Sequence, residues 1–438
     1  MDFLKSIFKG DKVVWAIFLF LCLISVLEVF SAASTLTYRS GDHWGPITQH
    51  ATFLVIGVIV VVLLHNVPYN WFKVIPVLLY PISVAMLVIV MIMGFVTGER
   101  VNGAARWMQL FGIQFQPSEL AKMAVVILTA FILSKGQSEE GAHPKAFTYI
   151  LVTAGIVCLL IAPENYSTAA LLFATVFLMM LVGRVQTRKL VILAGTLAVA
   201  LGLFVAFLVG TSDDTLRGIP GGHRFTTWKD RIVEFVEHEQ VPPAEFDIDD
   251  KAQEAHARIA VATSHIIGKG PGNSVERDFL SQAFSDFIYA IVIEESGLVG
   301  GAFVTLLYII LLVRVGRIAR KCDRVFPALL IIGVALLLVT QAMFNMMVAV
   351  GLAPITGQPL PLISKGGTST LINCAYIGMI LSVSRYTAKL DEQRAHDAAI
   401  AMTVSTGQPD EMLEPRPVVP QVVAEPTSEK LNEDSDMV

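Results

Sequence analysis

Long runs of apolar residues, nearly free of charge, are the feature that most restricts what this chain can fold into. One run occupies residues 13–33, and others follow at 50–66 and 74–96. An α-helix needs roughly 20 residues to cross the hydrocarbon core of a membrane. Backbone polar groups inside a membrane must be paired within the protein, so only helices or closed barrels can span it. Because barrel strands alternate apolar and polar residues and these runs do not, the sequence predicts helices.

Composition and spacing extend this prediction to the whole chain. Only 16% of the 438 residues are charged, whereas a soluble domain has about 25%. We predict an all-α polytopic membrane protein with about ten transmembrane helices and a large extracytoplasmic loop between helices 7 and 8. The first run is too long for the core of a signal peptide, so it is predicted to be retained. The predicted spans are 13–33, 50–66, 74–96, 117–134, 146–162, 166–183, 188–209, 284–313, 325–350 and 368–387.

The predicted organisation has five parts. A cytoplasmic N-terminus covers residues 1–12, transmembrane helices 1–7 cover 13–209, and the extracytoplasmic loop covers 210–283. Transmembrane helices 8–10 cover 284–387. The remaining residues, 388–438, are rich in Pro, Glu, Asp and Ser and lack an apolar period. They are predicted to form a disordered cytoplasmic tail.

The distribution of basic residues predicts the orientation, because Lys and Arg concentrate in cytoplasmic segments. With both termini in the cytoplasm, most Lys and Arg fall inside, and the short outside loops carry only Arg39, Arg100, Arg106 and Lys365. The four cysteines lie outside the large loop, so no exported disulfide is expected. The net charge of −5 gives no indication of nucleic-acid binding.

The large loop contains two stretches with helical patterns. Residues Trp228–His238 place their apolar side chains on one helical stripe, and Ala252–Ile267 follows. Both stretches fit helices that lie on the membrane surface. They equally fit two short helices that pack on each other, and the residues do not decide between these arrangements.

Asp286 is the candidate catalytic residue. It lies between aromatic residues where the large loop enters the eighth predicted span. Ionisable groups in membrane segments are costly and usually functional. A carboxylate in apolar surroundings is well suited to take a proton as a general base. The alternative is a helix-capping acid, favoured by the helix dipole.

A second candidate pair, Glu119 and Lys122, begins the fourth predicted span after Pro117, which fits a first helical turn. Their i, i+3 spacing lets the two side chains meet on one face. The pair is either a structural ion pair or a phosphate-binding cation held in place by its acid. Adjacent Glu294 and Glu295, in the eighth span, are expected to face different partners.

Three glycine-rich turns are predicted to lie on the same side of the membrane as Asp286. Exposed backbone amides at a helix start bind anions well. Each turn carries or adjoins a basic residue, which together favour an anionic ligand reached from outside. The turns are residues 102–107 with Arg106, residues 268–274 with Lys269, and residues 364–369 with Ser364, Lys365, Gly366 and Gly367.

Read together, these segments resemble the SEDS family (shape, elongation, division and sporulation). The resemblance covers about residues 12–387 and lies in five motifs that occur in family order. They are VNGAARW (101–107), QPSELAK (116–122), GKGPGNS (268–274), SDFIYAIVIEESGLVG (285–300) and PLPLISKGGTS (359–369). The acidic tail and the GNS turn are more similar to the division branch than to the elongation branch.

The resemblance implies a function and site residues. Family members are lipid II glycosyltransferases that extend glycan strands at the outer face of the bacterial cytoplasmic membrane. They work with class B penicillin-binding transpeptidases and, in division, with other divisome proteins. The family's essential loop aspartate falls on Asp286 and its membrane lysine on Lys122. The family's usual SYGG reads SKGG here, with Lys365 in place of the tyrosine.

The expected function is therefore polymerisation of lipid II during cell division. Asp286 is the expected catalytic residue. The expected substrate-binding residues are Glu119, Lys122, Arg106, Lys269, Ser364, Lys365, Gly366 and Gly367. A divalent cation, Mg²⁺ or Mn²⁺, is left open because the sequence shows no clear metal cluster. Two other functions fit the same residues, namely a lipid II flippase and a non-catalytic divisome scaffold. A flippase needs polar groups that are accessible from both faces of the membrane.

Overall fold

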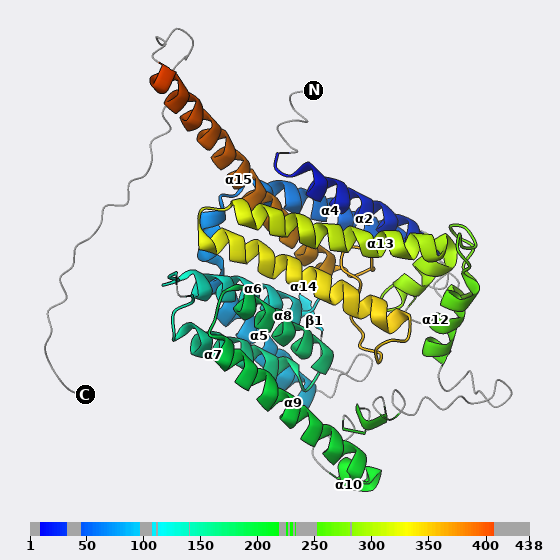
Figure 1. Ribbon diagram of the computed structural model, residues 1–438. Coiled ribbons are helices and arrows are strands. Elements are labelled where there is room, and N and C mark those ends of the chain that lie inside the picture. Colours follow the sequence, from blue (N-terminus) through cyan, green and yellow to red (C-terminus); the bar gives the residue numbers. More distant parts are fainter. Residues whose placement is uncertain are drawn as a thin grey trace, which may run out of the picture. The chain divides into compact units, whose positions relative to one another are not determined.

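The computed structural model describes residues 9–32, 45–96, 107–110, 113–139, 141–218, 225–226, 228–230, 233, 252–280 and 283–406. Each of the ten predicted spans coincides with a helix, which confirms the predicted fold class (Figure 1). Seven described helices are long and apolar enough to cross a membrane, and α7 and α8 are shorter apolar helices. The ten helices are α2 (Lys12–Ala32), α4 (Gly45–Asn66), α5 (Ile75–Val96), α6 (Pro117–Ser134), α7 (Ala146–Ile161), α8 (Tyr166–Val182), α9 (Thr187–Gly210), α13 (Ile288–Lys321), α14 (Val325–Ala349) and α15 (Thr368–Thr406).

Helix α14 lies at the centre of the bundle, where it packs against α6, α8 and α13. Of its most apolar window 72% is buried, compared with 6% for α9. Gly333 explains the close approach of its neighbours. A Cβ atom at this position would lie 2.4 Å from Met179 Cε and 3.1 Å from Val126 Cγ1. Side chains of α6 and α8 therefore fill the space that a larger residue would need.

Short elements connect these helices. They are the 3₁₀ helices η1 (Tyr69–Lys73) and η2 (Glu276–Asp278), and the helices α10 (Asp213–Arg217) and α12 (Ala252–Thr263). Strands β1 (Met108–Leu110) and β2 (Ile113–Phe115) form an antiparallel hairpin in which Gln109 pairs with Gln114. The sequence reading did not predict this hairpin, because two three-residue strands give too short an alternation to detect.

The two predicted helical stretches of the large loop are described by the structure to different extents. Helix α12 packs against α13 and α14 and buries Ala255, Ala257 and Ala260. Of the stretch 228–238, only residues 228–230 and 233 are described. There the Trp228 ring lies 5.7 Å from Tyr166 and 6.0 Å from Phe204, between ring centroids. The described part of each stretch therefore contacts the membrane bundle itself.

Four helix ends differ from the prediction by four residues or more. Helix α4 begins at Gly45 rather than at residue 50, and α13 ends at Lys321 rather than at residue 313. Helix α13 begins at Ile288 rather than at residue 284, because residues 283–287 form a turn. Helix α15 continues to Thr406, beyond the predicted end at 387. Residues 388–406, predicted to be disordered, are therefore helical. Their Ala, Leu, Glu and Arg content favours a helix even without an apolar stripe. The rest of the predicted tail, 407–438, lies outside the described residues.

Candidate functional site

Asp286 lies in the turn that precedes α13, and its side chain is half-buried. The Ser285 hydroxyl donates a hydrogen bond to Asp286 Oδ1 over 2.9 Å. The N-cap of α13 is Phe287, and no side chain of the described residues caps this helix. The alternative reading of Asp286 as a helix-capping acid therefore does not match the geometry.

The loop before α15 lies directly beside Asp286. The Ser364 hydroxyl donates to the Ser285 carbonyl over 2.7 Å. The Lys365 amide donates to the Phe284 carbonyl over 2.9 Å. These hydrogen bonds join the loop before α15 to two successive carbonyls of a turn about 80 residues earlier in the sequence. The structure brings Asp286, Ser364 and Lys365 together, which the sequence could place only on a common side of the membrane.

Lys365 supplies the positive charge of this site. Its Nζ lies 5.6 Å from the centroid of the Phe284 ring, a cation–π contact. Burial lowers the pKa of the Lys365 ammonium, because the charged form loses hydration. Within the described parts of the chain, no carboxylate forms a salt bridge with Lys365. A partly desolvated cation without a counter-charge favours the binding of an anion.

Two glycines join this lysine to α15. Gly367 has φ +50°, a left-handed conformation that glycine adopts without strain. A Cβ atom on Gly366 would lie 2.1 Å from Ser369 Oγ, so a larger residue would displace this hydroxyl. Helix α15 then starts at Thr368, where the positive end of the helix dipole favours a nearby anion. Ser364–Gly367 therefore form a compact cationic turn next to Asp286.

Buried amide side chains of α14 donate hydrogen bonds to the turn that carries Asp286 and to the loop that precedes α15. Asn345 Nδ2 donates to the carbonyl of Asp286 over 2.8 Å and to that of Gln358 over 2.7 Å. Gln341 Nε2 donates to the Pro359 carbonyl over 3.0 Å. One helix therefore fixes the turn that carries Asp286 and the loop that leads to Lys365.

Glu119 and Lys122 form an ion pair inside the bundle. Lys122 Nζ lies 2.8 Å from Glu119 Oε1, and the Lys122 side chain is 0% exposed. Lys122 Nζ also donates to Gln341 Oε1 over 2.9 Å. The observed contacts of Lys122 are therefore with protein groups. Through Gln341, the pair supports the loop at Pro359, so its geometry matches a supporting ion pair better than direct contact with a phosphate.

Lys269 lies in a turn whose polar groups are already engaged. Its Nζ donates to Glu294 Oε1 over 2.6 Å. Glu295 accepts from the Gly272 amide over 2.9 Å, and Glu294 accepts from the Val275 amide over 3.0 Å. The adjacent acids were expected to face different partners. Glu294 pairs with Lys269, whereas Glu295 accepts from the Ser31 hydroxyl of α2 and lies 3.8 Å from Arg277 Nη1. Both acids also accept from Ser274. Backbone amides of this turn therefore donate hydrogen bonds to the two carboxylates.

A break in α13 explains why both acids can reach this turn. Gly297 has φ +73° inside the helix, and a Cβ atom there would lie 2.2 Å from the Ile266 carbonyl oxygen. The turn therefore packs against α13 where only glycine fits. Arg106, the other basic residue assigned to a glycine-rich turn, lies outside the described residues. In the described ranges, no three His, Cys, Asp or Glu side chains group as metal ligands.

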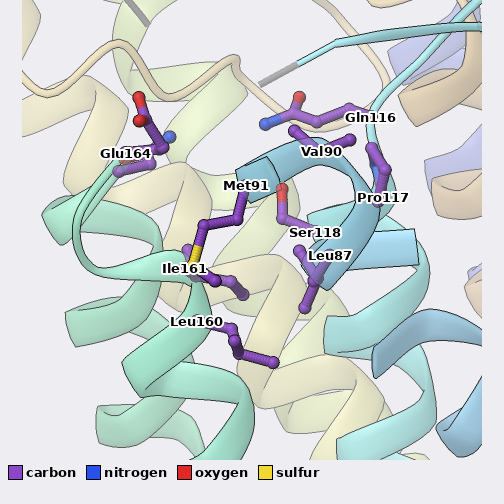
Figure 2. A pocket seen from close by; sticks show the side chains of 10 residues that line it. Leu87, Val90, Met91, Gln116, Pro117, Ser118, Leu160, Ile161 and Glu164 are labelled. Carbon is purple, nitrogen blue, oxygen red and sulfur yellow. The ribbon is translucent and has the colours of Figure 1, made fainter. Parts of the chain in front are cut away.

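A pocket opens between α5, α6, α7 and α8 (Figure 2). Leu87, Met91, Leu160 and Ile161 form its apolar wall, and Gln116, Ser118, Glu164 and Asn165 contribute polar groups. Hydrogen bonds connect it to the site. Asn165 caps α8 by accepting from the Thr168 amide, and the Thr168 hydroxyl accepts from Gln358, whose carbonyl Asn345 binds.

The family model for FtsW, RodA and SpoVE, described as cell cycle proteins, matches residues 11–389. The chain belongs to this family. A probable peptidoglycan glycosyltransferase FtsW from Halomonas elongata is 32% identical over 385 residues, covering 86% of this chain and 91% of that protein. This confirms the resemblance and agrees with the division branch.

Solved structures of the FtsW/RodA/SpoVE family have the same fold. One, from a peptidoglycan synthase complex that coordinates polymerization and crosslinking, has a TM-score of 0.64 at 24% identity and covers 86% of this chain and 98% of its own. The rod shape determining protein RodA of Thermus thermophilus has a TM-score of 0.58 at 22% identity, with coverage of 86% and 97%. The chain is thus a multi-pass membrane protein of this family.

The residues that hold the two segments of the site together were not predicted from the sequence. Gln341 and Asn345 were not singled out, although a signal was present. They are amides spaced i, i+4 in an otherwise apolar span, and polar residues in such spans usually face the bundle interior. Ser285 gave no comparable signal, because serines are common in loops.

Proposed function

We propose that this protein polymerises lipid II into glycan strands, as a peptidoglycan glycosyltransferase of cell division. The observation that carries the proposal is the placement of one carboxylate, Asp286, and one cation, Lys365, on two segments that are joined by hydrogen bonds. A glycosyl transfer from a pyrophosphate needs a proton acceptor and an anion site close together. The name of the Halomonas elongata relative supports the same reaction.

The reaction can be assigned to these groups step by step. The Asp286 carboxylate takes the proton from an acceptor sugar hydroxyl. The hydroxyl oxygen then forms a bond to the anomeric carbon of the lipid-linked donor, and the bond between this carbon and the pyrophosphate oxygen breaks. The Ser285 hydroxyl donates to Asp286 Oδ1 and so helps to fix the orientation of the carboxylate.

The leaving polyprenyl pyrophosphate carries negative charge that must be stabilised. Lys365 and the first amides of α15 provide a positive potential that is already in place, so little reorganisation is needed during the reaction. The half-buried position of Lys365 strengthens this interaction, because water screens it less than on an open surface.

Orientation and partner follow from the same proposal. We place both termini in the cytoplasm and the site at the outer face of the bacterial cytoplasmic membrane, on the basis of the Lys and Arg distribution. A class B penicillin-binding transpeptidase is the proposed partner, because a related structure is a peptidoglycan synthase complex. Purified protein supplied with lipid II tests the function, with glycan strands as the readout.

Lys365→Met should weaken donor binding. The loss of a charge-assisted hydrogen bond to pyrophosphate, worth roughly 1.5–3 kcal/mol, should raise KM for lipid II at least about tenfold. Lys365→Arg should stay near the wild-type KM, because it keeps the positive charge. The measurement is the initial rate of strand synthesis over a range of lipid II concentrations. A wild-type KM for Lys365→Met would contradict this role.

A further inference from the structure

The loop that carries Lys365 is held by side chains from three membrane helices. Four of its backbone carbonyls accept hydrogen bonds from buried donors. Leu362, inside this segment, has φ +67°, which is unfavourable for a residue with a Cβ atom. The loop therefore needs external support to keep this conformation. The donor–carbonyl pairs are Asn345 to Gln358, Gln341 to Pro359, Tyr308 to Pro361 and Ser25 to Ile363.

The Ser25 contact differs from the other three because a second residue supports it. Ser25 Oγ donates to the Ile363 carbonyl over 2.7 Å, and His50 Nε2 lies 2.8 Å from the same Ser25 Oγ. A hydroxyl carries one proton, which Ser25 gives to Ile363. Ser25 must then accept from His50, so Nε2 carries the hydrogen. Helices α2 and α4 thereby form a continuous hydrogen-bond chain to the loop.

The surroundings of His50 leave little freedom for another arrangement. Its side chain is 3% exposed, and Ser25 is 0% exposed. Among the described residues, His50 Nδ1 has no hydrogen-bond partner. A neutral ring with hydrogen on Nε2 leaves only a bare acceptor unpaired, whereas hydrogen on Nδ1 would leave both a buried donor unpaired and Ser25 without its donor.

We propose that Ser25 and His50 are positioning residues for glycosyl transfer. The neutral His50 ring fixes the Ser25 hydroxyl, and Ser25 fixes the Ile363 carbonyl. The next two residues of the loop, Ser364 and Lys365, bind the turn that carries Asp286. The His50–Ser25 chain therefore sets the distance between the cation and the carboxylate. This inference rests on the proposed function, and it assigns α2 and α4 a role in the site.

Three variants test the proposal by activity. His50→Leu should lower kcat for strand synthesis by roughly tenfold to a hundredfold, because small displacements of reacting groups have effects of this size. His50→Gln keeps a side-chain N–H for Ser25 and should stay within about threefold of wild type. His50→Leu combined with Ser25→Ala should be no worse than His50→Leu alone, because residues that act through one contact are not additive.

His65→Leu is the matched control. His65 is a second fully buried histidine on α4, and its Nδ1 contacts the Val62 carbonyl of the same helix. It has no described contact with the loop 358–365, so its replacement should leave kcat unchanged. Equal losses for His50→Leu and His65→Leu would overturn the proposal, since the effect would then be general damage to α4. Near wild-type kcat for His50→Leu would overturn it directly, as would a loss in His50→Gln equal to that in His50→Leu.

Hydrogen–deuterium exchange separates failure of this inference from failure of the proposed function. His50→Leu should speed exchange in a peptide covering residues 358–367, whereas His50→Gln and His65→Leu should not. This result in a protein that makes no glycan would preserve the positioning chain and reject the polymerase. Unchanged exchange in His50→Leu would reject the positioning chain, even if the wild-type protein polymerises lipid II.

Discussion

Asp286→Asn should reduce glycan strand synthesis by roughly 10²- to 10⁴-fold, the contribution of a positioned general base. Asparagine preserves the size of the side chain and can still accept from the Ser285 hydroxyl. It cannot take up the proton of the acceptor. Binding of lipid II should persist, because the pyrophosphate is assigned to Lys365 and the start of α15. The measurement is initial rate, with lipid II binding determined on the same protein.

Asp278→Asn is the matched control for this experiment. The same substitution is made at Asp278, eight residues before Asp286. The Asp278 carboxylate is half-exposed, and its Oδ1 lies 3.7 Å from Arg277 Nε. Exposed ion pairs contribute little to stability, so this variant should remain active. Strand synthesis by Asp286→Asn at the wild-type rate would show that the catalytic assignment is wrong.

Lys122→Met should abolish or nearly abolish strand synthesis by a different route. The change leaves the Glu119 carboxylate buried without its counter-charge, and among the described residues Glu119 Oε2 already has no hydrogen-bond partner. Breaking a buried pair on one side costs roughly 3–5 kcal/mol. Gln341 also loses the ammonium that orients it, so the support of the loop at Pro359 weakens. We expect a lower Tm together with the loss of activity.

A double variant distinguishes the missing charge from general misfolding. Glu119→Gln combined with Lys122→Met removes both charges and should recover much of the Tm lost in the single variant. Its activity should recover only if Gln341 regains its position. Full strand synthesis by Lys122→Met would contradict the supporting role and leave the ion pair dispensable. The comparison requires equal amounts of each variant in the membrane.

The sequence predicted the helices well because transmembrane spans are set by local apolar composition. It also predicted that Asp286 and Lys365 lie on one side of the membrane, since the order of the spans determines the side. It could not predict that Lys269 pairs with Glu294, because this contact depends on the break of α13 at Gly297. Spacing along the chain carries no information on such tertiary contacts.

The supporting residues were harder to predict for the same reason. Asn345 reaches Asp286 across 59 positions of sequence, and Ser25 reaches Ile363 across 338. A serine or an asparagine in a span indicates burial toward other helices, but many partners are available in a bundle of this size. The Glu119–Lys122 pair was predictable because its spacing is local. Its burial, and its contact with Gln341, required the structure.

The most direct test of the central claim uses purified protein in liposomes, with lipid II as the sole substrate. The length of the product glycan strands is measured on a gel, with and without the penicillin-binding partner. The account predicts strands of many disaccharides from the wild-type protein and essentially none from Asp286→Asn. Movement of lipid II across the bilayer without strand synthesis, in the presence of the partner, would contradict it and identify a transporter. Absence of both, together with normal division supported by Asp286→Asn in cells, would contradict it in favour of a scaffold.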